Sequence, residues 1–368
     1  MVLNYTSAAE LDVSLHHGCI NTIGFSATDF YTDFVGGSNH TSTSTATGNW
    51  EIHSKTFANS GANRLNFYVD NSNTDNFTHT IENRTSNTWI GGNGTGGGTK
   101  FNGSIAEVIK YTSTINTAQR IIIDNYLAAK YNISLASNDF YNEDNAGSGN
   151  FDFNVAGIGQ ASDGTNHTDS QGTGIIRISN PTGLANDEFL FWGEEVKDAN
   201  YDFSSSLSTN YLERIDTKWR VSRRNNPGRV TVRVNASDLT FNDTSGCNQL
   251  QLIVDNNSDF SSPEDTYTFT LSGGVYTVTN VRLRNNRYFT LQYVDQIVLD
   301  GATAYNGSGV SNKPNTSDDC YKLLVKSNTL TLTEDGDVRE VEVESGGTLL
   351  STLGSNKIFL PSACGGGG

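Results

Sequence analysis

Two short loops carry the side-chain oxygens that hard cations prefer. Asp255, Asn257 and Asp259 alternate along the chain as the first three ligands of a calcium loop do. Phe260 stands where that loop requires Gly, and Glu is missing from the twelfth place, so a polar hairpin is the competing interpretation. The other oxygen-rich loop, which comes first along the chain, contains Asp70, Asn71, Asn73 and Asp75. We therefore predict calcium as a candidate cofactor at these loops.

The spacing of the acidic residues does not indicate the facing carboxylate pair that glycoside hydrolysis needs. Glu194 and Glu195 are adjacent, so on a regular strand their side chains point to opposite faces. Glu340, Glu342 and Glu344 alternate along one run, which is typical of a solvated strand face. The sequence therefore predicts no catalytic residue and a protein that is not an enzyme.

Aromatic side chains near the N-terminus offer flat surfaces on which a sugar ring can stack. Trp50, Tyr68 and Trp89 are the candidates, because each lies in a short alternating run between polar turns. A place in the hydrophobic core is the competing interpretation for each of them. We predict that these residues contact any glycan that the chain binds.

The cysteines indicate a disulfide rather than a zinc site. None of the four is in CxxC spacing, which argues against zinc. Cys320 and Cys364 flank one β-rich stretch, and we predict a disulfide between them, while Cys19 and Cys247 stay unassigned.

The charge balance limits the classes of partner that the chain is expected to bind. A net charge of −16 argues against nucleic acid, because phosphate binding needs clustered cations. The one basic cluster lies on two strand-like runs and is interpreted as a solvated sheet face; it comprises Lys218, Arg220, Arg223, Arg224 and Arg229. No apolar run approaches the length of a transmembrane helix, so no membrane insertion is expected. A polar chain rich in Asn, Thr and Gly indicates an extracellular or cell-surface location.

The elements expected to position these residues are mostly short strands. Arg64–Asp70 alternates apolar and polar residues, and Phe101–Tyr111 is a further strand. One helix is predicted, capped by Asn116 or Thr117 and ended near Asn132 in a left-handed conformation. Its apolar stripe, which should pack on a sheet, consists of Ile122, Tyr126 and Ala129.

The order of these elements predicts an all-β chain of three parts. Residues 1–135 are expected to form a concanavalin A-like jelly-roll sandwich, with an atypical or truncated N-terminal part and one helix at its C-terminal end. Residues 136–297 read as a second β-sandwich, in which Gly157-Ile-Gly159 is a turn or bulge and not a dinucleotide site. Residues 298–368 are expected to form a small β-sheet or β-solenoid-like segment.

Nine segments together resemble a known family. They are Phe101–Tyr111, Gln119–Arg120, Tyr126–Leu135, Asn154–Gly159, Asp169–Gln171, Phe189–Gly193, Lys218–Val221, Asp255–Phe260 and Tyr288–Leu291. As a set they resemble Bacteroidota (flavobacterial-type) surface proteins in which a laminin-G/concanavalin A-like domain precedes an uncharacterised β domain. The family's usual Gly after Lys-Tyr is Asn132 here. Two departures matter: the first half of the lectin-like domain is not recognisable before Asn49, and no type IX sorting domain is visible at the C-terminus.

The resemblance implies a large, secreted or cell-surface protein, exported by type IX secretion and associated with adhesion or gliding. It transfers no catalytic residue. The leading hypothesis is therefore a non-enzymatic adhesion or glycan-binding module of a larger chain, whose partners are a glycan or surface polymer and the other domains of the parent protein. The alternatives are accessory domains of a polysaccharide-degrading enzyme and a purely structural spacer in a long adhesin.

Overall fold

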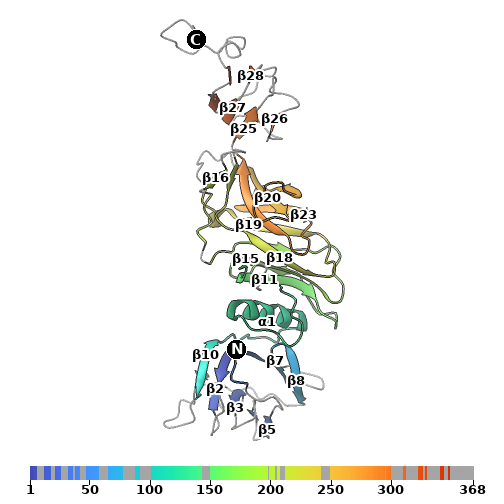
Figure 1. Cartoon of the computed structure of the whole chain (residues 1–368). Coiled ribbons are helices and arrows are strands. Elements are labelled where there is room, and N and C mark those ends of the chain that lie inside the picture. Colours follow the sequence, from blue (N-terminus) through green and yellow to red (C-terminus); the bar gives the residue numbers. More distant parts are fainter. Residues whose placement is uncertain are drawn as a thin grey trace. The chain divides into compact units, whose positions relative to one another are not determined.

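The computed structural model describes well over half of the chain (Figure 1). The described residues are 1–5, 12–17, 21–25, 32–35, 38–41, 47–57, 65–77, 88–91, 101–142, 150–197, 199–203, 205–207, 212–241, 249–294, 296–299, 310–311, 322–325, 328–329, 340–343 and 347–348. In this part the fold is an all-β sandwich fold with a single α-helix, and its sheets are mostly antiparallel. The predicted fold class is confirmed.

The chain divides into two compact units. The first consists of Met1–Lys197, Arg220–Val230 and Arg282–Asn286. The second consists of Asp198–Trp219, Thr231–Val281 and Arg287–Gly368. The three-part division expected from the sequence stays a prediction, and its boundaries differ from those of the two units.

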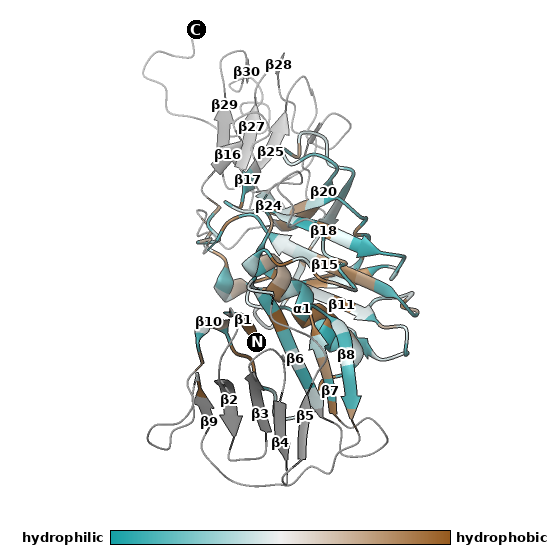
Figure 2. Cartoon of the chain, turned by 60° about the horizontal axis from the view of Figure 1, so that its bottom comes forward, coloured by the Kyte–Doolittle hydropathy of each residue, from teal (hydrophilic) through white to brown (hydrophobic). Residues whose placement is uncertain are grey.

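The first unit begins with a five-stranded sheet in the order β10-β1-β6-β7-β8. Its strands are β1 (Val2–Tyr5), β6 (Glu51–Phe57), β7 (Leu65–Val69), β8 (Ser72–Phe77) and β10 (Gly103–Glu107). The alternation predicted for β7 is present, because Leu65 and Phe67 are fully buried in a core with Leu3. Strand β8 lies at the edge and is almost entirely hydrophilic (Figure 2), which protects an exposed sheet edge from unwanted pairing.

Smaller β elements complete the N-terminal part of the first unit. Strands β3, β2 and β9 form a three-stranded sheet, and β4 pairs with β5. Their bounds are β2 (Asp12–His17), β3 (Asn21–Phe25), β4 (Thr32–Val35), β5 (Ser38–Thr41) and β9 (Thr88–Ile90).

Helix α1 (Thr117–Tyr131) has the ends that its sequence predicts. Asn116 forms a capping box with Gln119: its side chain accepts from the Gln119 N–H at 2.9 Å, and the Gln119 side chain accepts from the Asn116 N–H at 2.9 Å. Asn132 adopts the left-handed conformation, with φ of 53°, and ends the helix. The helix ends are therefore fixed by local chemistry.

The helix is buried against two different cores. On one side Ile122, Ala129 and the half-buried Tyr126 pack with Val155, Phe189 and other residues of the strands that follow, so the predicted stripe is confirmed. On another side Leu127 and Ala128 pack with Ile52 of β6 and with Ile133. Because α1 lines both cores, it is the layer that joins the N-terminal sheet to the β region after it.

Strands β11 (Phe153–Gln160) and β15 (Glu188–Glu194) form the floor beneath α1. Gly157 pairs with Phe191 and Gly159 pairs with Phe189 across the antiparallel ladder. A Cβ atom at Gly159 would lie 2.1 Å from Cδ1 of Phe189, so the absent side chain makes room for the ring. The prediction of a turn or bulge at Gly157-Ile-Gly159 was wrong, since these glycines lie inside the strand. Their missing side chains leave space for the facing phenylalanine rings.

The remaining β elements of the first unit are short. Strand β12 (Asn166–His167) pairs with β11, and β13 (Asp169–Ser170) pairs with β14 (Arg177–Ser179). Most of β18 (Trp219–Arg224) also belongs to this unit. The backbone N–H of Asn286 donates to the carbonyl of Val221 at 2.9 Å, which holds residues 282–286 beside β18.

The second unit has a core rich in aromatic rings. Phe203 stacks on Phe241 with ring centroids 4.8 Å apart, and both contact Tyr293 edge to face. Its strands are β16 (Ser205–Leu207), β17 (Leu212–Arg214), β19 (Val230–Asn235), β20 (Gln249–Asp255), β21 (Asp265–Thr268), β22 (Thr270–Ser272), β23 (Val275–Val281) and β24 (Tyr288–Val294), with a short 3-10 helix, η1 (Ala236–Asp238). Strand β24 pairs antiparallel with both β20 and β17.

The C-terminal strands pair mainly in parallel. Strand β25 pairs parallel with β27, which pairs parallel with β29, and β28 pairs parallel with β30. Their bounds are β25 (Gln296–Leu299), β26 (Val310–Ser311), β27 (Lys322–Val325), β28 (Asn328–Thr329), β29 (Glu340–Val343) and β30 (Gly347–Thr348). Parallel neighbours at close sequence spacing are typical of stacked rungs. The predicted disulfide between Cys320 and Cys364 lies outside the described residues.

Candidate functional site

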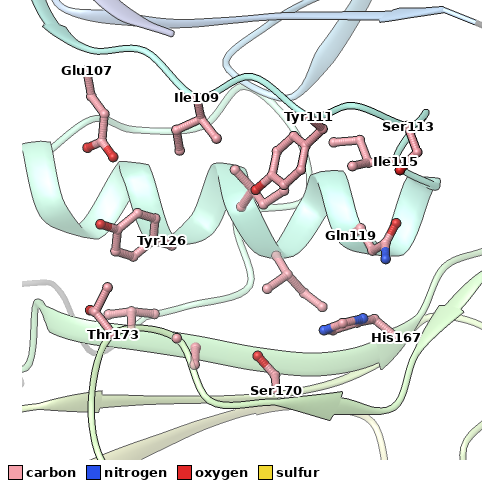
Figure 3. Close-up of a pocket in the computed structure, with 15 residues that line it drawn as sticks. Glu107, Ile109, Tyr111, Ser113, Ile115, Gln119, Tyr126, His167, Ser170 and Thr173 are labelled. Atoms are coloured by element: carbon pink, nitrogen blue, oxygen red, sulfur yellow. The ribbon is translucent and has the colours of Figure 1, made fainter.

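A pocket runs along helix α1 in the first unit (Figure 3). Its volume is about 560 Å³, within the range of about 300 to 1,000 Å³ that is usual for small-molecule sites. The walls come from three segments: the connection from β10 to α1, the helix itself, and the β11–β13 region. Isoleucines supply much of the apolar lining, including Ile109, Ile115 and Ile122. Below, "the α1 pocket" means this cavity.

Two tyrosines give the α1 pocket its aromatic surfaces. Tyr111 is 48% exposed in the connection from β10 to α1, and Tyr126 is half-buried on the helix. Burial, and then the negative charges of Asp124 and Glu107, raise the pKa of Tyr111, so its hydroxyl keeps its proton. The Tyr126 hydroxyl accepts a hydrogen bond from Lys130 Nζ at 3.0 Å, which fixes its ring. The pocket thus offers one exposed and one anchored aromatic ring.

Uncharged polar groups lie at the edges of the α1 pocket. In Figure 3, His167, Ser170 and Thr173 extend from the strands on one side of the helix, and Gln119 lies near its N-terminal end. Burial lowers the pKa of His167 and outweighs the opposing charge of Asp169, so its ring is neutral. A neutral imidazole both donates and accepts a hydrogen bond, as hydroxyl groups do. The edge of the pocket can therefore recognise a ligand rich in hydroxyl groups.

Glu107 is the one carboxylate among the residues that line the α1 pocket. Its Oε2 accepts hydrogen bonds from Lys130 Nζ and from the Tyr131 hydroxyl, both at 2.8 Å. Burial alone would raise the pKa of Glu107, but these two hydrogen bonds and the lysine charge hold it below its ordinary value. Glu107 is therefore an ionised, engaged carboxylate, which suits it to structure more than to proton transfer.

The three aromatic residues predicted to bind glycans lie elsewhere. Trp50 is 40% exposed just before β6. The Tyr68 ring is covered by the guanidinium of Arg120, whose central carbon lies 3.8 Å from the ring centroid. Trp89 belongs to β9, and its side chain is outside the described residues. Of the three, Trp50 keeps an accessible ring in the described part of the chain.

The first predicted calcium loop is a tight hairpin between β7 and β8. Asp70 and Asn71 both have positive φ, 44° and 67°, and form a two-residue turn of the type that suits antiparallel strands. The Asn71 Oδ1 accepts a hydrogen bond from Arg120, and the Asp70 Oδ1 accepts one from the backbone of Ile52 at 2.8 Å. The guanidinium of Arg120 therefore bonds to this turn, and calcium binding here stays a prediction.

The other two residues of that predicted site lie on β8. Asn73 is exposed and bonds weakly to Asn76 at 3.5 Å, and Asp75 is half-buried further along the strand. Only Asp70 and Asn71 occupy the turn, so the four oxygens are spread over a hairpin and its edge strand.

The second predicted calcium loop is also closed by an arginine. The Asp255 Oδ1 accepts from the backbone N–H groups of Asn256 and Asn257, a common turn geometry. Asp259 accepts from Ser261, and the Arg214 guanidinium donates to the Asp259 carbonyl at 2.8 Å. The hairpin interpretation describes this geometry. Among the described residues, no group of three His, Cys, Asp or Glu side chains could hold a metal ion.

Titratable groups gather between α1 and the N-terminal sheet. Asp124 is 1% exposed, bonds to Arg120 Nη1 at 3.3 Å and accepts from the Ser54 hydroxyl at 3.2 Å. Burial raises its pKa to about 6 despite the charge of Arg120. Burial likewise raises the pKa of Asp70 to about 6 and lowers that of His53 to about 4. This cluster holds the helix to the sheet and lies behind the pocket lining.

Asp124→Asn should flatten part of the pH dependence of stability. The folded protein holds the Asp124 proton more tightly than the unfolded chain does. The stabilising contribution of this proton to the free energy of unfolding is therefore full below pH 4 and is lost as the pH rises to about 6. We expect the free energy of unfolding of the wild type to fall by up to about 3 kcal/mol relative to the variant over that window. Urea unfolding from pH 4 to 7 measures it.

The control for this prediction is Asp216→Asn, which changes an exposed carboxylate. It should leave the pH dependence of the wild type unchanged. Equal curves for the wild type and Asp124→Asn would contradict the assignment. His53, whose pKa is lowered, contributes with the opposite sign in the same window, so only the difference between the two proteins isolates Asp124.

The pocket tyrosines were missed as binding residues for a physical reason. Tyr126 lies at helical spacing, so the sequence places it in the apolar stripe, and in the structure it packs against that core. Tyr111 follows a strand and precedes a polar connection, which is the one local signal of an accessible ring. Nothing in the spacing brings Tyr111 to His167, because 55 residues, including α1 and β11, lie between them.

Comparison with known proteins gives one family and no function. A family model described as a domain of unknown function, DUF8202, matches residues 119–287. The match begins inside α1 and includes β11 and β15, so the helix and its phenylalanine floor are in the matched part. No curated protein and no solved structure matches this chain. In the described part of the chain, no helix has the length and apolar character needed to cross a membrane.

Proposed function

We propose that the chain is a non-enzymatic glycan-binding module of a larger extracellular or cell-surface protein, with the saccharide held in the α1 pocket. The observation that carries the proposal is the pairing of Tyr111 and Tyr126 with uncharged hydrogen-bonding groups around one cavity. Adhesion of the parent protein to a surface polymer follows from this role.

The lining of the α1 pocket suits the two-sided character of a sugar ring. One face of a pyranose presents C–H groups, which pack on aromatic rings and on isoleucine side chains. Its edge presents hydroxyl groups, which match the neutral imidazole of His167 and the hydroxyls of Ser170 and Thr173. A cavity of about 560 Å³ accommodates a short saccharide segment.

The carboxylate inventory favours binding over hydrolysis. Glycoside hydrolases place two carboxyl groups about 5 to 9.5 Å apart across the scissile bond. Among the described residues that line the α1 pocket, Glu107 is the one carboxylate, and it accepts hydrogen bonds from Lys130 and Tyr131. The pocket therefore has the means to hold a sugar without the pair needed to cleave it.

The composition supports a location outside the cell. The chain has 17% charged residues, a net charge of −16 and many short polar turns between strands. The resemblance to secreted Bacteroidota surface proteins points the same way. Export by type IX secretion is part of this proposal and is checked by locating the parent protein in fractionated cells.

Tyr111→Ala should weaken glycan binding about tenfold, because it removes a stacking surface worth about 1 kcal/mol or more. A glycan array identifies ligands of the full chain, and titration calorimetry then compares the variants. Trp50→Ala is the matched control, since Trp50 is the exposed aromatic residue that the sequence favoured. A loss of binding with Trp50→Ala and none with Tyr111→Ala would place the site elsewhere. Release of reducing sugar by the wild type would contradict a non-enzymatic role.

A further inference from the structure

Four arginines converge in the first unit, outside the α1 pocket. Arg223 and Arg224 end strand β18, while Arg282 and Arg284 belong to the adjacent residues 282–286. The backbone N–H of Arg223 donates to the Asn285 side chain at 2.7 Å, which fixes the two segments together. We call Arg223, Arg224, Arg282 and Arg284 the arginine cluster.

Arg223 is bound by neutral oxygens. Its Nη1 donates to the carbonyl of Leu283 at 3.1 Å and its Nε to the carbonyl of Asn225 at 2.7 Å, and a further bond goes to the side chain of Asn226. Leu283 lies between Arg282 and Arg284, so these bonds hold the guanidinium beside two like charges. Burial first, and then those two charges, lower the pKa of Arg223, against a weaker opposing effect of Glu188.

Arg224 is exposed, and a ring orients its guanidinium. The guanidinium carbon lies 4.4 Å from the ring centroid of the buried Phe140. Stacking of this kind leaves the N–H groups at the edge of the guanidinium directed outward. Arg282 is also exposed. Arg224 therefore presents pre-oriented donors at the surface, and Arg282 adds a second exposed positive charge to the cluster.

This concentration of positive charge contrasts with the rest of the protein. The whole chain has 24 Lys and Arg against 40 Asp and Glu. A face that needs only solubility mixes charges of both signs, whereas clustered like charges repel and attract anionic partners. The interpretation of the strand arginines as a merely solvated face does not explain why residues 282–286 add two more beside them.

We propose that the arginine cluster binds the carboxylate or sulfate groups of an acidic polysaccharide. The planar guanidinium pairs with these planar or tetrahedral anions through two parallel hydrogen bonds. Nucleic acid is the competing polyanion, and the test below compares it directly with an acidic polysaccharide. The inference rests on the proposed function in taking a glycan as the polymer, but it uses residues apart from the α1 pocket.

The test compares dextran sulfate with neutral dextran, which share a backbone, on the full chain by biolayer interferometry at low salt. The triple variant Arg224→Gln, Arg282→Gln and Arg284→Gln should bind dextran sulfate at least about tenfold more weakly than the wild type, with a shallower salt dependence. The matched control removes three other exposed cations of the same unit by Lys110→Gln, Arg177→Gln and Lys197→Gln. It should keep most of the affinity.

Several results would overturn the proposal: no binding of dextran sulfate by the wild type, equal losses in the two triple variants, or tighter binding of double-stranded DNA than of dextran sulfate at equal charge. The proposals for the arginine cluster and for the α1 pocket can be refuted independently. If the arginine variant keeps its dextran sulfate affinity while Tyr111→Ala loses a neutral glycan, the cluster proposal falls and the α1 pocket stands. Unfolding curves of all variants confirm that each is folded.

Discussion

Asn125→Leu is expected to lower the free energy of unfolding by about 3 kcal/mol or more, because it leaves several buried backbone groups without their hydrogen-bond partner. The Asn125 Oδ1 accepts from the N–H groups of Phe140 and Tyr141 at 2.8 and 2.9 Å. Its Nδ2 donates to the carbonyls of Ile121 and Asn138 at 2.8 and 2.9 Å. Leucine has the same branched arrangement of four side-chain heavy atoms and makes none of these bonds, so the chain after α1 loses its polar attachment to the helix.

Chemical denaturation followed by tryptophan fluorescence measures this change. Asn150→Leu is the control, since Asn150 is exposed and the substitution should cost little. A loss below about 1 kcal/mol for Asn125→Leu would contradict the account of Asn125 as the anchor of the segment after α1.

Gly159→Ala should destabilise the protein by about 2 to 3 kcal/mol through overpacking. The added Cβ would lie 2.1 Å from Cδ1 and 2.6 Å from Cε1 of Phe189, far inside contact distance. Phe189 is fully buried, with its ring 5.2 Å from that of Phe140 and 6.0 Å from that of Phe191, so it has no free space to move into. The floor beneath α1 would have to shift.

A double-mutant cycle identifies the cause of that loss. Phe189→Leu alone leaves a smaller, more flexible side chain opposite Gly159. Combined with Gly159→Ala, it should recover part of the lost stability, giving a coupling energy of about 1 kcal/mol. If the stability losses of the two single variants simply add in the double variant, Gly159 is needed for its backbone conformation and not to leave space for the Phe189 ring.

Local chemistry made α1 predictable. Asn116, Gln119 and Asn132 lie within a few residues of the helix ends that they fix, so the sequence itself carries those boundaries. The apolar stripe was predictable for the same reason, because helical spacing puts Ile122 and Ala129 on one face. What spacing could not show is that a second face of α1 is buried too.

Long-range packing decided the features that were not predictable. Gly157 and Gly159 look like turn residues until the register places them opposite Phe191 and Phe189. Spacing also could not show that Arg120 and Arg214, which lie 49 and 45 residues from Asn71 and Asp259 in sequence, bond to the oxygen-rich loops. In each case the deciding partner comes from a distant segment.

The α1 pocket is also a feature that depends on long-range packing. Its three walls come from segments that the register and the helix bring together, and Tyr111 becomes a pocket residue only when α1 packs against β11. Most of α1, together with β11 and β15, falls in the region that the family model matches, residues 119–287.

A crystal structure of the chain with the tightest ligand from the glycan array tests the central claim most directly. The account predicts an intact saccharide in the α1 pocket, with one ring face against Tyr111 and hydroxyl groups within hydrogen-bond distance of His167 or Ser170. A saccharide bound at Trp50 with the α1 pocket empty, or a cleaved saccharide in the pocket, would contradict it.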